Sequence, residues 1–151
     1  MISKNNKNQE KQLLRDKTYM KMAIVLSELS HAIRNKVGCI IVSPDGQIIS
    51  QGYNGTPSGF DNCCEYKNEL GELVTKKEVL HAESNAISKC AKQTTSTLGA
   101  TMYITLSPCF ECSKLIIQSG IKRVCYLQNY RNEDGINLLK KANIIVDKIE
   151  I

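Results

Sequence analysis

The sequence lacks tryptophan and has few other aromatic residues, with two phenylalanines and six tyrosines among 151 residues. Proteins that bind single-stranded nucleic acid stack the bases on rows of aromatic rings, so this composition argues against that class. Long apolar runs are missing as well. The most notable one, Met22 to Leu26, is far shorter than the roughly 20 residues of a membrane span, so we expect no membrane-crossing segment.

A secretory signal is also not visible at the start of the chain. Lys4 and Lys7 could form its basic region, but Glu10, Gln12 and Arg15 occupy the place of the apolar segment that should follow. We therefore expect a cytoplasmic protein. Residues 1–10 are polar and have nothing to bury, which predicts a frayed N-terminal extension.

The charge balance is only mildly basic. Lys and Arg total 20 against 15 Asp and Glu, which gives a net charge of +5. This excess favours an anionic partner without reaching the bias of a nucleic-acid-binding tail, and a phosphorylated small molecule would satisfy it. The length and the 42% hydrophobic content predict a single domain over 1–151.

Seven cysteines are an odd number in a chain without a visible secretory signal. A complete disulfide framework is therefore not expected, and metal-binding or catalytic thiols are favoured. Cys63 and Cys64 lie in a predicted loop, where we expect free thiols; a second metal site that also uses His31 is the alternative. The cysteines in predicted strands and helices should act as small buried hydrophobes: Cys39, Cys90 and Cys125.

The first half of the chain predicts one helix followed by a hairpin. Between Leu13 and Ile33, apolar residues recur at spacings of three and four, which is typical of a helix that faces a core. The stripe consists of Tyr19, Met22, Ala23, Leu26, Leu29 and Ile33. Two β-branched runs, 38–42 and 47–53, flank a turn with Pro44 and Gly46 and predict two antiparallel strands.

The second half of the chain reads as alternating strands and helices. The predicted order is helix 81–92, strand 101–106, helix 108–120, strand 123–127, helix 136–142 and strand 144–149. Helices between strands favour parallel pairing with right-handed crossovers, and so an α/β fold whose sheet is covered on both faces. The segment 53–80 has turn residues in its first half and is too long for a simple connection, so we expect a functional or disordered loop.

Two short motifs at predicted helix starts carry the chemistry: His81-Ala82-Glu83 and Pro108-Cys109-Phe110-Glu111-Cys112. Taken singly, the first could be a helix cap and the second a redox-active or buried thiol pair. Together they offer three zinc ligands, which leave one position open as a catalytic zinc requires, whereas a structural zinc takes four. A closed zinc site or packed thiols would leave the unligated Glu83 unexplained.

The spacing of these residues has a mechanical reason. Cys109 and Cys112 are three residues apart on one helix face, and the positive end of the helix dipole favours the thiolates that bind metal. His81 and Glu83 would point to opposite sides of a regular helix, so His81 must lie at the helix boundary. Zinc lowers the pKa of a bound water, and Glu83 can shuttle the released proton.

The pattern H-x-E followed by P-C-x-x-C is the signature of zinc-dependent nucleobase deaminases. Around it, the sequence resembles the deoxycytidylate (dCMP) deaminase family of the cytidine deaminase superfamily, from about Arg34 to the C-terminus. The resemblance lies in Val37-Gly38, GYNGTPSG (52–59), HAESNAI (81–87), SPCFEC (107–112) and KLIIQSGIKRV (114–124).

This resemblance implies an αβα sandwich around a five-stranded mixed sheet, and the reaction of dCMP and water to dUMP and ammonia. It also implies a homohexamer, a catalytic Zn²⁺ ion, activation by dCTP with Mg²⁺ and inhibition by dTTP, in deoxynucleotide metabolism. His81, Cys109 and Cys112 correspond to the zinc ligands, and Glu83 to the catalytic carboxylate.

The same resemblance assigns further residues to ligands. Asn54 would hold the sugar 3′-hydroxyl with Thr56 nearby, Arg34 and Lys36 would contact the phosphate, and Tyr130 would line the pocket over the nucleotide. The glycine-rich loop motivates an effector site at Gly55, Pro57, Ser58 and Gly59. Turn chemistry is the alternative explanation of the loop residues, and an ordinary surface position that of Arg34, Lys36 and Tyr130.

Two other functions compete with this assignment. The metal motif alone also fits a deaminase that acts on tRNA adenosine, guanine or free cytidine. The modest charge argues against tRNA, and the long insertion argues against a free nucleoside. A non-catalytic, zinc-stabilised binding module belongs to a different class, and substitution of Glu83 by Gln would distinguish it from an enzyme.

Overall fold

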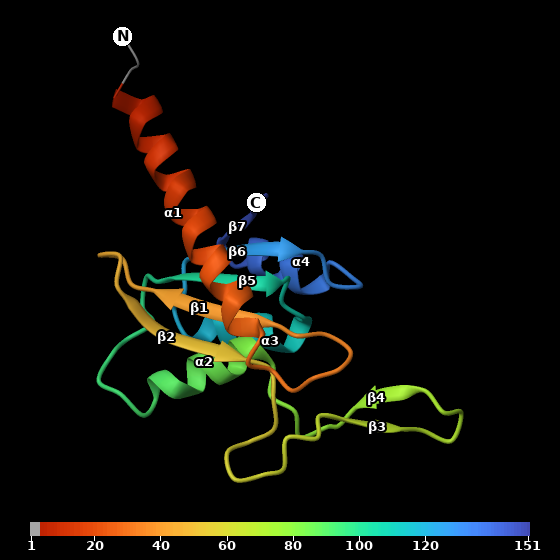
Figure 1. Ribbon diagram of the computed structural model, residues 1–151. Helices are drawn as coiled ribbons and strands as arrows, with labels where there is room; N and C mark the ends of the chain where they lie inside the picture. Colours follow the sequence, from red (N-terminus) through yellow and green to blue (C-terminus); the bar gives the residue numbers. More distant parts are fainter. Residues whose placement is uncertain (1–3) are drawn as a thin grey trace.

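The computed structural model describes residues 4–151 and is organised around a mixed five-stranded sheet (Figure 1). The strands of this sheet are β1 (Gly38–Val42), β2 (Ile48–Tyr53), β5 (Thr101–Leu106), β6 (Arg123–Gln128) and β7 (Ile145–Lys148). Their order across the sheet is β2-β1-β5-β6-β7. The β1–β2 and β1–β5 pairs are antiparallel, and the β5–β6 and β6–β7 pairs are parallel, as the sequence predicts for the hairpin and for the second half.

Helices cover both faces of the sheet and complete an αβα sandwich. One face is packed against α1 (Lys4–Ser27), and the other against α2 (Ala82–Cys90), α3 (Phe110–Gln118) and α4 (Asp134–Lys141). The predicted helices and strands of the second half are confirmed to within about two residues at most ends. No helix among residues 4–151 combines the length and the apolar character that crossing a membrane requires.

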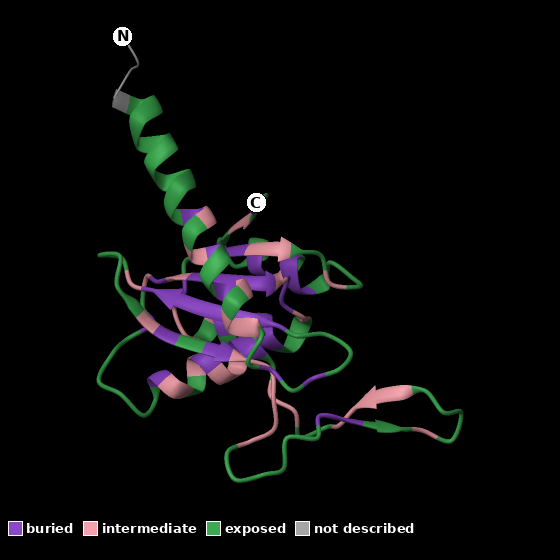
Figure 2. Cartoon of the chain, viewed as in Figure 1, coloured by how far each residue is buried: buried purple, intermediate pink, exposed green. Residues whose placement is uncertain are grey.

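The central strands β1 and β5 are largely buried (Figure 2), and each face of the sheet has its own apolar core. Under α2, α3 and α4 the core includes Ile41, Met102, Ile104 and Val124, none of which is more than marginally exposed. Alternate residues of the same strands point to the other face, because successive side chains of a strand lie on opposite sides of the sheet. There they pack against Met20 and Ala23 of α1, and the residues are Ile40, Val42, Tyr103 and Cys125. Cys39, Cys90 and Cys125 are buried, as predicted.

The first helix differs from the sequence prediction at both ends. It begins at Lys4, so residues 4–10 are helical rather than frayed, and residues 1–3 lie outside the described residues. Residues 5–10 are exposed and extend the helix beyond the part of α1 that is anchored by the buried Asp16, Met20 and Ala23. The helix ends at Ser27, where the chain turns toward β1, and not at Ile33.

The buried stripe of α1 agrees with the predicted one only in part. Asp16, Met20 and Ala23 are buried at helical spacing, whereas Met22, which we placed in the stripe, is 42% exposed. Leu29 and Ile33 lie beyond the end of the helix and are 57% and 74% exposed. Ala23 is buried as predicted, and Tyr19 and Leu26 pack against the same core. The buried Asp16 interrupts the apolar pattern, and hydrophobicity alone does not indicate its burial.

The long segment between β2 and α2 is neither a disordered loop nor part of the main sheet. It folds back as a small antiparallel hairpin, β3 (Glu65–Lys67) and β4 (Leu73–Thr75), which extends away from the body of the molecule (Figure 1). Its turn contains Gly71 in the left-handed region with φ of 76°. An isolated bridge between Gly55 and Leu80 closes the base of the segment.

Candidate functional site

The three predicted metal ligands lie at the starts of two neighbouring helices. His81 is the N-cap of α2 in an extended conformation, which confirms that it lies at the helix boundary. Cys109 is the N-cap of α3, and Cys112 lies three residues further in its first turn. Because α2 and α3 pack against each other, their first turns bring the three side chains together.

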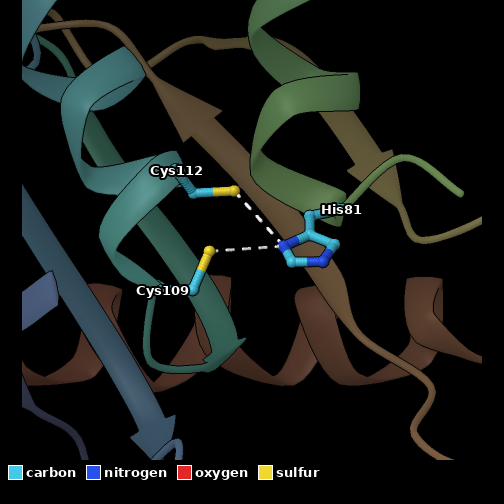
Figure 3. A group of neighbouring side chains, drawn as sticks. All are labelled: His81, Cys109 and Cys112. Atoms are coloured by element: carbon cyan, nitrogen blue, oxygen red, sulfur yellow. Dashed lines mark hydrogen bonds between the residues drawn. The ribbon is translucent and has the colours of Figure 1, made fainter. Parts of the chain in front are cut away.

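Both sulfur atoms point at one ring nitrogen of His81 (Figure 3). The Sγ atoms of Cys109 and Cys112 lie 3.5 and 3.4 Å from Nδ1. Tetrahedral zinc with its usual bond lengths separates a nitrogen from a sulfur ligand by about 3.6 Å. The donor types and these distances therefore fit zinc, and all three ligand atoms lie within 4.8 Å of one another.

Two glycines allow these helix starts to lie close to neighbouring elements, α2 to β2 and α3 to α4. A Cβ atom at Gly52 of β2 would lie 2.4 Å from the carbonyl oxygen of Ala82 and 2.6 Å from the amide nitrogen of Ala86. A Cβ atom at Gly135 of α4 would lie 2.1 Å from the carbonyl oxygen of Pro108. Backbone contacts thus set the positions of α2 and of the start of α3.

The electrostatics of the cysteine pair favour a thiolate. A hydrogen bond between the two thiols is the largest cause that lowers the pKa of Cys109, to about 3, and it raises the pKa of Cys112. The hydrogen bond to Cys109 in turn raises the pKa of His81. The arrangement thus supplies the deprotonated sulfur that binds a metal cation.

Glu83 lies in the first turn of α2 and is only 4% exposed. Burial, the largest cause, raises the pKa of its carboxyl group to about 7. The side chain lines the same cleft as His81 and Cys109. A carboxyl group in this position can hold or release a proton beside the metal ligands.

Two of the predicted ligands, His81 and Cys109, line a cleft of about 830 Å³. One part of its wall comes from the loop before β1 and from the β3–β4 hairpin, and another from the segment after β6. Four cationic side chains line it, Arg34, Lys76, Lys77 and Arg131, against three carboxylates, Glu65, Glu83 and Glu111. Such a cleft suits a small anionic molecule with a reacting group near Glu83.

Residues 14–128 match the family described as the cytidine and deoxycytidylate deaminase zinc-binding region. The chain belongs to this family. Its relatives include the deoxycytidylate deaminase of Enterobacteria phage T4, 36% identical over 85% of this chain and 86% of that protein. The deoxycytidylate deaminase of Saccharomyces cerevisiae is 36% identical over 87% of this chain and 43% of that protein.

Among solved structures, the dCMP deaminase of the cyanophage S-TIM5 in complex with dCMP and dUMP has a TM-score of 0.81. It is 47% identical, and the match covers 87% of this chain and 94% of that one. The resemblance to deoxycytidylate deaminases and the cytidine deaminase-like fold are thereby confirmed.

The structure divides the family-derived substrate residues into two groups. Arg34, Asn54 and Tyr130 line the cleft that holds the metal ligands. Lys36 is exposed and lies outside the lining of this cleft, and Thr56 lines a different pocket, where its hydroxyl donates to the carbonyl oxygen of Asp61 at 2.5 Å. Lys36 and Thr56 are therefore not brought together with the deaminase metal ligands.

Asn54 uses its side-chain amide to shape the wall of the cleft. Its Oδ1 accepts a hydrogen bond from the backbone N–H of Val37 at 2.8 Å, and its Nδ2 donates to the carbonyl oxygen of Asn35 at 2.7 Å. These bonds hold the loop before β1. Asn54 thus acts on that loop in this structure, in addition to facing the cleft.

The four residues predicted for an effector site share a second, smaller pocket with Thr56. It has a volume of about 260 Å³ and is lined by Gly55, Pro57, Ser58 and Gly59. Tyr53 and Lys89 complete one side, with the Lys89 ammonium 5.5 Å from the centre of the Tyr53 ring. Asn54 lines both pockets and so lies between them.

A second metal site is not formed by Cys63, Cys64 and His31. Within residues 4–151, only His81, Cys109 and Cys112 form a group of three potential ligands close enough to share an ion. The Cys63 thiol donates to the carbonyl oxygen of Glu65, and the Cys64 thiol to that of Asn62. Both are free thiols, as expected.

Sequence reasoning missed the residues that the hairpin adds to the cleft. These are Glu65, Thr75, Lys76 and Lys77. The length of the insertion indicated a functional segment, but no periodicity pointed to particular side chains. Ser107 was also missed: its hydroxyl accepts the backbone N–H of Tyr130 at 2.7 Å and positions that residue at the cleft.

Proposed function

We propose that this protein is a zinc-dependent deaminase that hydrolyses dCMP to dUMP and ammonia. One observation carries the proposal: three zinc-type ligands and a buried, unligated carboxylate meet in a cationic cleft. The names of the relatives and the nucleotides in the S-TIM5 complex supply the substrate class. The product would serve the synthesis of thymidine nucleotides.

His81, Cys109 and Cys112 would hold the metal in this proposal. When bound there, zinc supplies Lewis-acid activation of water at neutral pH. Three protein ligands suit a catalytic ion, since a structural ion takes four. The fixed helix starts orient the three donor atoms before any ligand arrives.

Glu83 would be the catalytic acid and base. Its carboxyl group would take a proton from the attacking water and deliver it to the ring nitrogen of the base. It would then take the remaining proton of the hydroxyl now bonded to the ring carbon and pass it to the departing amine, so that the carbonyl group of the product forms as ammonia leaves. Its burial excludes bulk water from these transfers. A metal ligand in its place could not perform them, since ligation would occupy its oxygen atoms.

The cations at the cleft would bind the 5′-phosphate. Arg34, Lys76, Lys77 and Arg131 provide positive charge at its wall, and an arginine can bind a phosphate through two parallel hydrogen bonds. Tyr130 would contact the base, with its ring held near the Arg131 guanidinium at 5.2 Å. Asn54 would stabilise this wall through its hydrogen bonds with the backbone of Asn35 and Val37.

The decisive experiment is ammonia release from dCMP, CMP, deoxycytidine, dCTP and AMP by the zinc-loaded protein. We expect turnover of dCMP above all others. Preference for another base or for a free nucleoside would move the assignment to another deaminase of the superfamily. Silence on all five substrates with one zinc per chain would favour a polynucleotide substrate or a non-catalytic zinc module.

We also propose regulation by dCTP with Mg²⁺ and by dTTP at the smaller pocket. Its support is a separate cavity with a cationic side chain, Lys89, that shares Asn54 with the catalytic cleft. Helix α2 also joins the smaller pocket to the catalytic cleft. Its residue Asn85 lines the smaller pocket and donates to the carbonyl oxygen of Tyr53, and its residue Glu83 lines the cleft. Initial rates at low dCMP should rise with dCTP and fall with dTTP. Unchanged rates would refute this regulation.

Assembly into a homohexamer in the cytoplasm completes the proposed function. Several apolar side chains of α1 lie exposed to solvent, among them Leu14 and Val25 at 68% and 64%. Such residues are suited to contacts between subunits. Light scattering of the purified protein should give six times the mass of one chain, 16.9 kDa.

A further inference from the structure

Helix α1 and the turn that follows it carry an apolar stripe on the face that points away from the sheet. The stripe consists of Leu14, Thr18, Met22, Val25 and Leu29. At about 100° per residue these positions fall within an arc of roughly 80°, opposite the buried face of the helix. Its four large apolar side chains are between 42% and 68% exposed, so residues 4–151 leave the stripe uncovered.

Local hydrogen bonds make the stripe continuous. The Thr18 hydroxyl donates to the carbonyl oxygen of Leu14 at 2.8 Å, so this side chain needs no acceptor from a partner. Beyond the end of the helix, the backbone N–H of Leu29 donates to the carbonyl oxygen of Leu26 at 3.1 Å and continues the helical path. At 1.5 Å per residue the stripe is about 22 Å long, which is sufficient for a contact between two helices.

The stripe is complementary to a second copy of itself. Its spacings are four, four, three and four residues, which read almost the same in both directions. Two copies of α1 packed antiparallel around a two-fold axis at Met22 would therefore match along the whole stripe. Leu14 would lie opposite Leu29 of the partner subunit, and Thr18 opposite Val25 of the partner subunit. A two-fold contact of this kind uses the same surface patch on both copies.

Charged residues at the two ends of the stripe favour the antiparallel direction. Arg15 and Lys17 flank its beginning, Glu28 flanks its end, and all three side chains are at least partly exposed. None of them forms an ion pair within residues 4–151. An antiparallel pair would bring Glu28 of each copy beside Arg15 and Lys17 of the other. A parallel pair would place like charges together, which is unfavourable.

The first half of α1 also lacks packing of its own. It projects beyond the sheet (Figure 1), and residues 5–15 are all exposed. A helical segment of this length is only marginally stable in water without tertiary contacts. A second helix lying along α1 would supply such contacts.

We infer that α1 packs antiparallel against α1 of a second copy of this chain, around a two-fold axis at Met22. The inference rests on the proposed function in one respect, since it specifies one of the contacts that the proposed homohexamer requires. The predicted metal ligands lie at the starts of α2 and α3, on the opposite face of the sheet from α1, so the contact does not involve them.

The first test measures self-association by sedimentation equilibrium. Leu14→Asp and Val25→Asp each introduce a charge into the stripe and should raise the dissociation constant of the contact about 10- to 100-fold. Leu13→Asp is the matched control, because Leu13 is 52% exposed on the same helix but lies outside the stripe. It should keep the natural dissociation constant, and circular dichroism checks that each variant is folded. Equal weakening by all three changes, or by none, would overturn the inference.

A charge exchange tests the direction of the two helices. Glu28→Lys and Lys17→Glu should each weaken association about three- to tenfold. The double variant restores opposite charges across an antiparallel contact and should recover the natural dissociation constant to within about twofold. A double variant that associates no better than the two single ones would refute the antiparallel arrangement.

Cysteine crosslinks locate the axis, in a Cys63→Ala background that lacks the exposed thiol of the hairpin segment. Under mild oxidation Met22→Cys should form a covalent dimer, because Met22 would lie next to its counterpart. Leu14→Cys alone should not, whereas its combination with Leu29→Cys should. Crosslinking of Leu14→Cys alone would indicate a parallel contact and overturn the inference.

The outcomes for this inference and for the proposed function are distinct. A hexamer in which Met22→Cys does not crosslink refutes this contact and leaves the homohexamer standing. A crosslinked dimer that assembles no further supports the contact and refutes the hexamer. Deamination of dCMP is measured separately from both. A natural protein that stays monomeric at every concentration would overturn the inference and leave the stripe to a different occupant.

Discussion

The metal ligands and the hairpin insertion contribute to one cleft by different means. The ligands stand in the first turns of two helices packed on the sheet, at sequence spacings that determine their geometry. The hairpin has only three residues in each strand. Its residues Glu65 and Thr75 line the cleft, and Glu65 is hydrogen-bonded to the loop before β1. The predicted metal ligands thus come from the regular elements, whereas part of the cleft wall comes from an insertion, the kind of segment that varies most easily.

The largest effect is expected from the removal of one predicted metal ligand at the start of α2 or α3. Cys112→Ala should abolish zinc binding and reduce deamination to background, because two remaining ligands do not retain a catalytic ion. Metal analysis together with ammonia release checks both effects. Cys63→Ala, an exposed thiol outside the ligand group, is the matched control and should keep one zinc per chain. Full activity of Cys112→Ala would disprove the assigned ligand set.

Removal of the proton-transfer group should cost less than removal of the metal. Glu83→Gln should lower kcat by about 10²- to 10⁴-fold, the usual contribution of general acid–base catalysis, while zinc content stays the same. Single-turnover rates and metal analysis measure the two quantities. A change of less than threefold in kcat would show that Glu83 is not the acid and base.

A third region, the contact between α1 and the sheet at Asp16, stabilises the fold without facing the cleft. Substitution there should change stability but not activity. Asp16 of α1 accepts two hydrogen bonds from Arg123, at 2.8 and 2.9 Å, and one from the Tyr103 hydroxyl at 2.7 Å. Arg123 also pairs with Asp147 and is partly exposed. Asp16→Ala should therefore lower the free energy of unfolding by about 2 kcal/mol, less than the roughly 3 to 5 kcal/mol of a fully buried pair.

Urea denaturation measures this loss, and kcat/KM of the folded variant should stay near that of the natural enzyme. The contribution also depends on pH. Burial opposes ionisation of Asp16, but the hydrogen bonds from Arg123, Tyr103 and Gln12 outweigh it and lower the pKa of the carboxyl group. Its stabilisation is therefore present above the unfolded pKa of about 3.9 and is lost as the pH falls through the folded value. A stability difference between the two proteins that does not shrink as the pH falls below the unfolded pKa would contradict this account.

The smallest effect is expected from the hairpin itself. Thr75→Val removes the hydroxyl that accepts from Arg34 at 3.3 Å and should loosen the orientation of that guanidinium. We expect KM for dCMP to rise about two- to threefold at an unchanged kcat, as suits one weak, exposed hydrogen bond. Steady-state kinetics check the split. A fall in kcat at constant KM would instead place Thr75 in the chemical step. The hairpin would then not differ in role from the predicted metal ligands.

The same contrast explains what could be predicted from the sequence. The strands of the main sheet and the ligands His81, Cys109 and Cys112 follow from local patterns, in which the alternation of residues or their spacing determines the geometry. The end of α1 at Ser27 did not follow, because Leu29 and Ile33 continue the apolar spacing beyond the point where the chain turns. The burial of Asp16 is likewise decided by Arg123, a residue 107 positions away.

Glu65 illustrates the limit for the candidate site. In the sequence it follows two cysteines in a polar insertion and resembles the exposed Glu69 and Glu72 of the same segment. Only the contacts with the backbone of Ile33 and Arg34, 32 and 31 positions away, make it a buried acceptor. The separation of Thr56 from the metal ligands is a tertiary property of the same kind, which the adjacency of Asn54 and Thr56 conceals.

The close approaches at Gly52 and Gly135 have a consequence for thermal motion. Core side chains move between rotamers, and distances that depend on them fluctuate accordingly. At these two glycines, backbone lies against the neighbouring element without an intervening side chain of the glycine itself. The start of α2 is thus held against β2, and the start of α3 against α4, by contacts that depend little on rotamer changes in the core.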